Sequence, residues 1–107
     1  MSIRQVSATE LKAGIQSEKS LFLLDVREPN EFEYARIENS VLIPLNQIPQ
    51  RLGELNPQQE MVVICHHGVR SRQACMYLVN SGFKNVSNLT GGIDVWSCDC
   101  DNSVPRY

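Results

Sequence analysis

The sequence predicts a single α/β domain with a central, mainly parallel sheet of five strands flanked by helices. Three observations lead to this fold class. The chain has 107 residues, a usual length for one domain, which we place at residues 1–107. Short apolar runs alternate along it with stretches of helical periodicity. The runs at 21–26 and 61–64 are apolar almost throughout, as expected of strands buried on both faces of a parallel sheet.

The first half of the chain holds three of the expected strands. Residues 3–6 are expected to form a short first strand, and a Ser-x-x-Glu capping box at 7–10 opens a helix after it. The run at 21–26 is the second strand. The third strand, at 40–45, is stopped by a proline, and 46–55 then places apolar residues at helical spacing.

Asp25 interrupts the second strand near its end, and Arg27 follows it. A catalytic role is one interpretation of this aspartate. We favour a structural one, in which Arg27 or nearby backbone amides hydrogen-bond the buried carboxylate, because buried acids persist by pairing. Pro29 then suits the first turn of a short helix.

The second half of the chain repeats the order of strand and helix. The strand at 61–64 leads into a polar loop, and 71–81 has the most regular helical pattern, with Gly82 in place for a left-handed C-terminal cap. Cys75 lies on the apolar face of this helix, so we interpret it as a core residue. A last strand at 86–89 and a glycine turn precede a terminal helix or turn.

Composition and charge narrow the class of protein. Apolar residues make up 42% of the chain, enough for one core, and the formal net charge is −2. No long basic run suggests nucleic-acid binding. The first residues lack the apolar segment of a signal peptide, and the apolar runs are too short to cross a bilayer. We therefore expect a cytoplasmic protein that binds neither nucleic acid nor a membrane.

The four cysteines are interpreted as reduced thiols, because no secretory signal accompanies them. Their spacing does not match a zinc site, so no metal or cofactor is expected. Cys98 and Cys100 fall in a polar C-terminal tail, residues 98–107. They could accept sulfur or form a labile redox pair, but we favour incidental thiols on a loosely held terminus, since termini tolerate change.

Residues 61–72 carry the predicted chemistry. An apolar strand ends in Cys65, a polar loop follows, and a helix begins after Arg70. Four residues separate Cys65 from Arg70, and Gly68 between them lets the backbone curl and direct its amides towards one point. Thiols beside a helix N-terminus or a cation ionise more readily. We therefore predict that Cys65 is a nucleophile acting on a small anion, which Arg70 helps to bind.

The other loop residues are predicted to contact the substrate through their backbones. His66, His67 and Val69 contribute N–H groups, and the two histidines add modest positive potential at the rim. We assign neither histidine as a general base, because an amide cradle can activate the thiol without one. A role as proton donor to the leaving group stays open, since histidine titrates in the useful range. Arg72 either adds to the field at the rim or is simply solvated.

Together these motifs resemble those of the single-domain rhodaneses, the thiosulfate sulfurtransferase family. The loop Cys-x-x-Gly-x-Arg is specific when Asp-Val-Arg stands upstream and Gly-Gly-x-x-x-Trp downstream, and the likeness covers most of the chain. It implies a rhodanese-like fold for the whole domain. The residues that carry the resemblance lie at 24–28, 31–32, 43–44, 63–71, 89–93 and 96.

The resemblance also implies a reaction. Cys65 would attack the outer sulfur of thiosulfate or a related donor, release sulfite and hold the sulfur as a persulfide. A thiol in the cell, or cyanide in an assay, would then accept the sulfur, and a sulfur-carrier protein is a further partner. The amides of residues 66–70 would stabilise the charge of the persulfide, Arg70 would orient the donor, and Asp25 with Arg27 would be architectural.

Two alternative functions stay open, and one segment of the chain departs from the family pattern. Phosphatases and arsenate reductases of related fold use a loop one residue longer, so the shorter loop here favours a single sulfur atom over a tetrahedral oxyanion. A non-catalytic rhodanese-like binding or regulatory module is less favoured, because such modules often lack the cysteine. The family pattern Gly-His-Ile-x-Gly-Ala is replaced at 35–40 by Ala-Arg-Ile-Glu-Asn-Ser, so the local turn is expected to differ.

Overall fold

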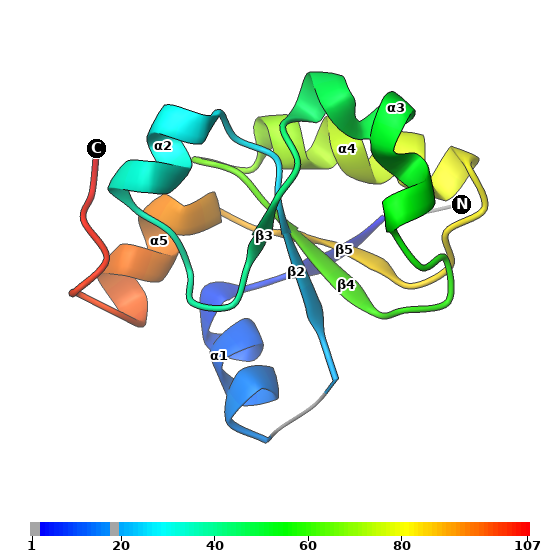
Figure 1. Ribbon diagram of the computed structural model, residues 1–107. Coiled ribbons are helices and arrows are strands. Elements are labelled where there is room, and N and C mark those ends of the chain that lie inside the picture. The colour runs from blue at the N-terminus through cyan, green and yellow to red at the C-terminus, as the bar shows by residue number, and fades with distance from the viewer. Residues whose placement is uncertain (1–2, 18–19) are drawn as a thin grey trace.

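The computed structural model describes residues 3–17 and 20–107 (Figure 1). In these residues five strands form one sheet, in which every neighbouring pair is parallel and the order is β1-β5-β4-β2-β3. The predicted five-stranded, mainly parallel sheet is therefore confirmed. The strands are β1 (Arg4–Val6), β2 (Phe22–Asp25), β3 (Val41–Leu42), β4 (Met61–Ile64) and β5 (Val86–Leu89).

Helices cover both faces of this sheet. Helices α1 and α5 pack on one face, while α3 and α4 cover the other (Figure 1). No helix in the described part of the chain is long and apolar enough to span a membrane. The helices are α1 (Ala8–Gln16), α2 (Pro29–Tyr34), α3 (Ile48–Arg51), α4 (Val69–Asn80) and α5 (Gly92–Asp99).

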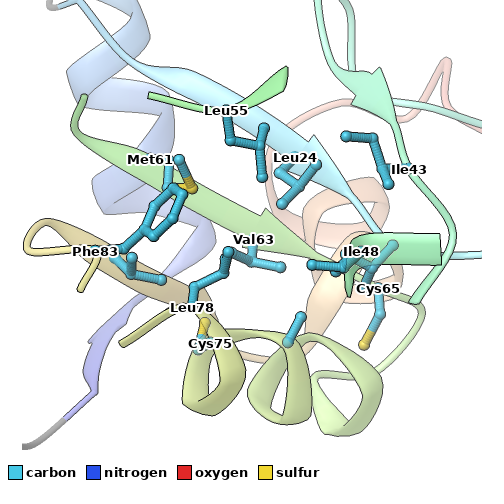
Figure 2. Close-up of a cluster of buried hydrophobic side chains, with 13 residues drawn as sticks. Leu24, Ile43, Ile48, Leu55, Met61, Val63, Cys65, Cys75, Leu78 and Phe83 are labelled. Atoms are coloured by element: carbon cyan, nitrogen blue, oxygen red, sulfur yellow. The ribbon is translucent and has the colours of Figure 1, made fainter. Parts of the chain in front are cut away.

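Strand β4 lies in the middle of the sheet and positions the candidate site. All four of its residues are buried. Met61 and Val63 point into the core cluster beneath α3 and α4 (Figure 2), whereas Val62 and Ile64 face the cluster beneath α1 and α5. Such burial on both faces is typical of a parallel strand. Cys65 follows directly, so β4 delivers the thiol to the carboxyl edge of the sheet, where sites form in open α/β folds.

Two predicted helix ends are confirmed. Ser7 Oγ accepts a hydrogen bond from the Glu10 N–H at 3.1 Å, and the Glu10 carboxylate accepts one from the Ser7 N–H at 2.9 Å, which completes the capping box. Gly82 has a φ of 95° and ends α4 in the left-handed region. Helix α4 begins at Val69, two residues before its predicted start, so Arg70 lies in its first turn.

The helical pattern at 46–55 is realised only in pieces. A 3₁₀ turn at Leu45–Gln47 leads into the four-residue α3, and a second 3₁₀ turn follows at Leu52–Glu54. Pro49 lacks the N–H that a continued helix would use, and Gly53 is a weak helix former. The apolar spacing still serves its purpose, because Ile48 is buried in the core cluster shown in Figure 2.

The atypical turn at 35–40 places one residue, Asn39, in the left-handed region of backbone conformation. Asn39 stands at the second glycine of the family pattern and has a φ of 69°. Asparagine is one of the few residues other than glycine that adopts this left-handed conformation readily. Asn39 therefore provides a left-handed residue where the family pattern has a glycine.

The C-terminal residues are packed against the domain, so the expectation of a loosely held terminus is wrong. Helix α5 continues through Asp99, and Val104 is only 7% exposed. The Ser97 hydroxyl donates a hydrogen bond to the Val104 carbonyl. Arg106 pairs with Asp94 at 3.0 Å, which ties the end of the chain to the start of α5.

Candidate active site

The loop after β4 has the strand–loop–helix order that the sequence predicted. Cys65 is 1% exposed, and its thiol lies beneath the turn that leads into α4. Gly68 makes that turn with a φ of 110°, a conformation that residues with a Cβ rarely adopt. Its N–H donates a hydrogen bond to Cys65 Sγ at 3.0 Å. Gly68 therefore supplies one backbone donor to the sulfur.

A second polar group reaches the sulfur, and sequence reasoning missed it. Ser71 Oγ lies 3.2 Å from Cys65 Sγ, and Ser71 is fully buried. Ser71 shares the inner face of α4 with Ala74 and Cys75, one turn further on. A small hydroxyl residue at helical spacing from core residues was the available signal. This spacing indicates a buried hydroxyl, and Cys65, at the end of the preceding strand, is its hydrogen-bond partner.

Ser71 is connected in turn to β5. Its hydroxyl donates a hydrogen bond to Asn88 Oδ1. The Asn88 Nδ2 group donates to the Gly68 carbonyl and to Gln5 Oε1, at 3.2 Å each. Asn88 is 4% exposed, so its amide is part of the interior of the loop. A polar amide within the short strand predicted at 86–89 was the sequence signal for this contact.

Arg70 is held by an acidic partner from α2. Its two terminal nitrogens donate to the two carboxylate oxygens of Glu31 at 2.6 and 2.8 Å. These bonds hold the pKa of Glu31 down at about 2 and raise that of the Arg70 guanidinium. Glu31 also accepts from the Glu28 N–H at 2.9 Å. Arg70 was predicted to bind an anion. In the structure the Glu31 carboxylate already pairs with one edge of its guanidinium.

Tyr107 covers the other side of the loop. Its ring stacks on His66 with centroids 3.9 Å apart, and His66 stacks on His67 at 4.0 Å. The Tyr107 hydroxyl accepts from Arg27 Nη1 at 2.7 Å and donates to Glu31 Oε2 at 2.9 Å. Burial, with the nearby His67, lowers the pKa of His66. The His66 ring therefore packs against both Tyr107 and His67.

Asp25 and Arg27 form the structural pair that we favoured. Both side chains are fully buried. The Asp25 carboxylate accepts from the Arg27 Nε at 2.9 Å, from its Nη2 at 2.7 Å and from its backbone N–H at 3.0 Å. Arg27 Nη2 also donates to the Ala35 carbonyl at 2.6 Å. The pair therefore fixes the segment that carries Glu31.

The glycine turn before α5 lets that helix approach the loop closely. The N–H of Ile93 donates to the Cys65 carbonyl at 2.9 Å, and the N–H of Asp94 donates to the His66 carbonyl at 3.2 Å. A Cβ on Gly92 would lie 2.3 Å from the His66 carbonyl oxygen and 2.4 Å from that of Cys65. The N-terminus of α5 thus holds the backbone of the loop after β4. The sequence predicted the glycine turn before α5 but not this contact.

The remaining predicted residues lie at the surface or in the core. Val69 and His67 are exposed, and Arg72 is a solvated residue of α4. Burial raises the pKa of Cys75 to about 12, in keeping with its interpretation as a core residue. Cys98 is exposed, and all four cysteines are free thiols. Among the described residues, no group of three His, Cys, Asp or Glu side chains is placed to hold a metal ion.

Comparison with known proteins identifies the family and agrees with the fold. The family model described as Rhodanese-like domain matches residues 7–99. Thiosulfate sulfurtransferase GlpE of Vibrio cholerae is 32% identical over 78% of this chain and 78% of its own. A rhodanese-related protein of Thermoplasma volcanium has a crystal structure that superposes with a TM-score of 0.82, at 33% identity, over 91% of this chain and 93% of that one.

One further relative is longer than this chain. The putative sulfur carrier protein YrkF of Bacillus subtilis is 41% identical over 90% of this chain, which spans about half (52%) of its length. Fold, loop and relatives lead to one conclusion: the chain belongs to the rhodanese-like domain family, and within it to the sulfurtransferases.

Proposed function

We propose that this chain carries sulfane sulfur as a persulfide on Cys65, taking it from thiosulfate or a related small anionic donor. The observation that carries the proposal is the environment of the sulfur. Cys65 Sγ is buried at the carboxyl end of a central parallel strand, and it accepts a hydrogen bond from the Gly68 N–H. The loop closes after four intervening residues, which suits the volume of one additional sulfur atom.

The first half of the reaction transfers sulfur to the protein. The Cys65 thiolate attacks the outer sulfur of thiosulfate, the sulfur–sulfur bond of the donor breaks, and sulfite leaves with the bonding electrons. The new terminal sulfur carries the negative charge. Backbone N–H groups of residues 66–70 would stabilise this charge, as oriented amides do for anions elsewhere.

The second half returns the protein to its starting state. A nucleophilic acceptor attacks the terminal sulfur, and Cys65 leaves as the thiolate. Cyanide serves as the acceptor in an assay, and a thiol would serve in a cytoplasmic setting. The name of the relative YrkF supports a sulfur-carrier protein as one physiological partner.

Arg70 is assigned to donor binding. A guanidinium has five N–H groups in a fixed fork, and the pair with Glu31 uses only some of them. Glu31 therefore orients Arg70 while it reduces the net positive charge at the mouth of the site. Affinity for an anionic donor should accordingly be modest and sensitive to salt.

Thiosulfate:cyanide turnover tests the proposal. We expect activity in the wild type, none in Cys65→Ser, and wild-type activity in Cys98→Ser, the matched control at an exposed cysteine. Full activity in Cys65→Ser would place the nucleophile elsewhere. Robust turnover of a phosphotyrosine analogue without thiosulfate:cyanide activity would support a phosphatase instead, and absence of any sulfur adduct would support a binding module.

A further inference from the structure

We propose that Glu31, which Tyr107 holds in place on Arg70, makes the mouth of the loop select singly charged sulfur donors over dianionic thiosulfate. Such a donor carries its terminal sulfur on an organic group, as a persulfide, R–S–S⁻, or a thiosulfonate, R–SO₂–S⁻. The inference deepens the proposed function and rests on Cys65 being the sulfur carrier. It makes Glu31 a specificity-determining residue and Tyr107 the residue that positions it.

Glu31 covers one edge of the Arg70 guanidinium on which an anionic donor could bind. The two terminal nitrogens of Arg70 donate to separate carboxylate oxygens of Glu31, at 2.6 and 2.8 Å. A bidentate pair of this kind is also how a guanidinium binds other oxyanions. The Arg70 side chain is 34% exposed and that of Glu31 is 15% exposed, so an incoming donor meets both charges.

Tyr107 and the backbone keep the Glu31 carboxylate in this position. Arg27 Nη1 can only donate, so the Tyr107 hydroxyl accepts there, at 2.7 Å, and gives its own proton to Glu31 Oε2, 2.9 Å away. The Glu28 N–H donates to the other carboxylate oxygen at 2.9 Å. With the two bonds from Arg70, these contacts fix the carboxylate from three directions.

The other cations around the loop are paired or screened. Arg27 is fully buried with Asp25. Arg106 pairs at 3.0 Å with Asp94, in the first turn of α5. Arg72 is exposed on α4, where water and salt screen its charge. The mouth of the loop therefore offers an anion little net attraction.

The charge of the donor decides how it fares at such a mouth. Arg70 alone would favour a dianion, because Coulomb attraction is proportional to charge, and Glu31 cancels that advantage. The sulfur of Cys65 is buried, so a donor must leave part of its water shell to reach it. Removing a dianion from water costs more than removing a monoanion. Without a compensating net charge, the singly charged donor is favoured.

An exposed apolar residue beside Arg70 suits a donor with an organic group. Val69 is the first residue of α4 and is 69% exposed. Contact with an organic group would remove part of this apolar surface from water, which is favourable. Thiosulfate has no carbon atom with which to make that contact. The apolar rim and the paired charges therefore favour the same class of donor.

Transfer from such a donor needs no oxidant or reductant. The Cys65 thiolate attacks the terminal sulfur of the donor, a new sulfur–sulfur bond forms, and the bond between the two sulfurs of the donor breaks. The bonding electrons leave with the organic fragment, a thiolate R–S⁻ from a persulfide or a sulfinate R–SO₂⁻ from a thiosulfonate. Cys65 keeps the terminal sulfur and its negative charge, and no proton is taken up or released.

Two donors that differ chiefly in charge test the inference. Methanethiosulfonate has a methyl group in place of one charged oxygen of thiosulfate. The readout is kcat/KM for thiosulfate divided by kcat/KM for methanethiosulfonate, with cyanide as the acceptor. Glu31→Gln should raise this ratio roughly fivefold over wild type, the effect of one unit charge on one extra donor charge about 4 Å away in water. An unchanged or lower ratio would overturn the inference.

Two further variants separate donor selection from loosening of the loop, which lowers both kcat/KM values together. Glu54→Gln is the matched control, since it removes the same charge from an exposed pair with Arg51 and should leave the ratio unchanged. Tyr107→Phe removes the hydroxyl that positions Glu31, so the ratio should rise, though less than in Glu31→Gln. A rise in Glu54→Gln, or a further rise when Tyr107→Phe is added to Glu31→Gln, would contradict the inference.

A third donor, the persulfide of mercaptoethanol, distinguishes the two organic classes. Its kcat/KM should respond to Glu31→Gln as that of methanethiosulfonate does, and a response as large as that of thiosulfate would count against the inference. Whichever of the two organic donors has the larger kcat/KM in the wild type identifies the class that the site prefers.

Inhibition of the wild type covers the case in which Glu31→Gln does not fold. Sulfate and methanesulfonate are unreactive analogues of the first two donors, and methanesulfonate should inhibit at the lower concentration. Stronger inhibition by sulfate would sink the inference. Detection of the sulfur adduct on Cys65 tests the proposed function separately. An adduct with the wrong ratio refutes donor selection alone, whereas no adduct from any donor refutes both.

Discussion

Replacement of Gly92 by alanine should damage both the stability of the domain and the chemistry of the loop. Gly92 has a φ of 63°, and a Cβ there would lie 2.3 Å from the His66 carbonyl oxygen. These are backbone atoms, so relief requires α5 or the loop to move. Movement would break the bonds from the Ile93 and Asp94 N–H groups to the loop carbonyls.

The expected loss follows from two contributions. The left-handed conformation costs a residue with a Cβ about 1–2 kcal/mol. Each of the two backbone hydrogen bonds contributes about 0.5–1.5 kcal/mol. Gly92→Ala should therefore lower the free energy of unfolding by about 2–5 kcal/mol, and thiosulfate:cyanide turnover should fall because the Cys65 backbone is displaced.

Gly82→Ala is the matched control. Gly82 also has a positive φ, 95°, but a Cβ there meets nothing within 4 Å. Gly82 follows the C-terminal end of α4, whereas Cys65 precedes the N-terminal end of that helix. Only the conformational cost of about 1–2 kcal/mol applies, and activity should persist. Urea unfolding and turnover of both variants provide the comparison. Equal losses in the two variants, or an active and stable Gly92→Ala, would refute the reasoning.

Three further predictions concern groups around the loop. The pKa of Glu31 is lowered from 4.5 to about 2, chiefly by Arg70, so the pair stabilises the fold above pH 4.5 and this stability is lost as pH falls towards 2. Glu31→Gln should lack that part of the acid dependence in urea titrations, and an unchanged dependence would contradict the assignment. Tyr107→Leu should uncover His66 and raise its pKa in an NMR titration, whereas Tyr107→Phe keeps the stacked ring and should leave it low; equal shifts in both would exclude the stack as the cause. Cys75, with a pKa of about 12, should resist alkylation at mildly alkaline pH while exposed Cys98 reacts, and rapid modification of Cys75 in folded protein would show that it is not core.

Much of the architecture could be read from local patterns. Continuous apolar runs identify strands buried on both faces, and that identification places Cys65 at the carboxyl edge of the sheet. The Asp25–Arg27 pair was accessible for the same reason, because both residues lie within two positions of one strand end. Turn chemistry at Gly82 is equally local.

The contacts that complete the site are not local, which explains why sequence reasoning missed them. Ser71 meets Asn88 from the next strand of the sheet, and Glu31 meets Arg70 from a helix 39 positions earlier. Tyr107 reaches His66 only because α5 and the residues after it fold back over the loop. No periodicity encodes such pairs, because they depend on how separate elements pack.

The contacts that anchor the C-terminus are likewise not local, so the terminus was predicted wrongly. Residues 98–107 are polar in sequence, and polar termini are often loose. Here one apolar residue, Val104, packs into the core beneath α1 and α5, and Tyr107 stacks on the loop. Two anchoring side chains therefore order a segment whose composition suggests none.

Mass spectrometry of the protein after exposure to thiosulfate tests the central claim most directly. The proposal predicts that the Cys65 peptide gains one sulfur atom, that cyanide removes it, and that Cys65→Ser never acquires it. A donor panel of thiosulfate, glutathione persulfide and a protein persulfide would identify the preferred source. Sulfur found only on Cys98 or Cys100, or on no cysteine with any donor, would contradict the account.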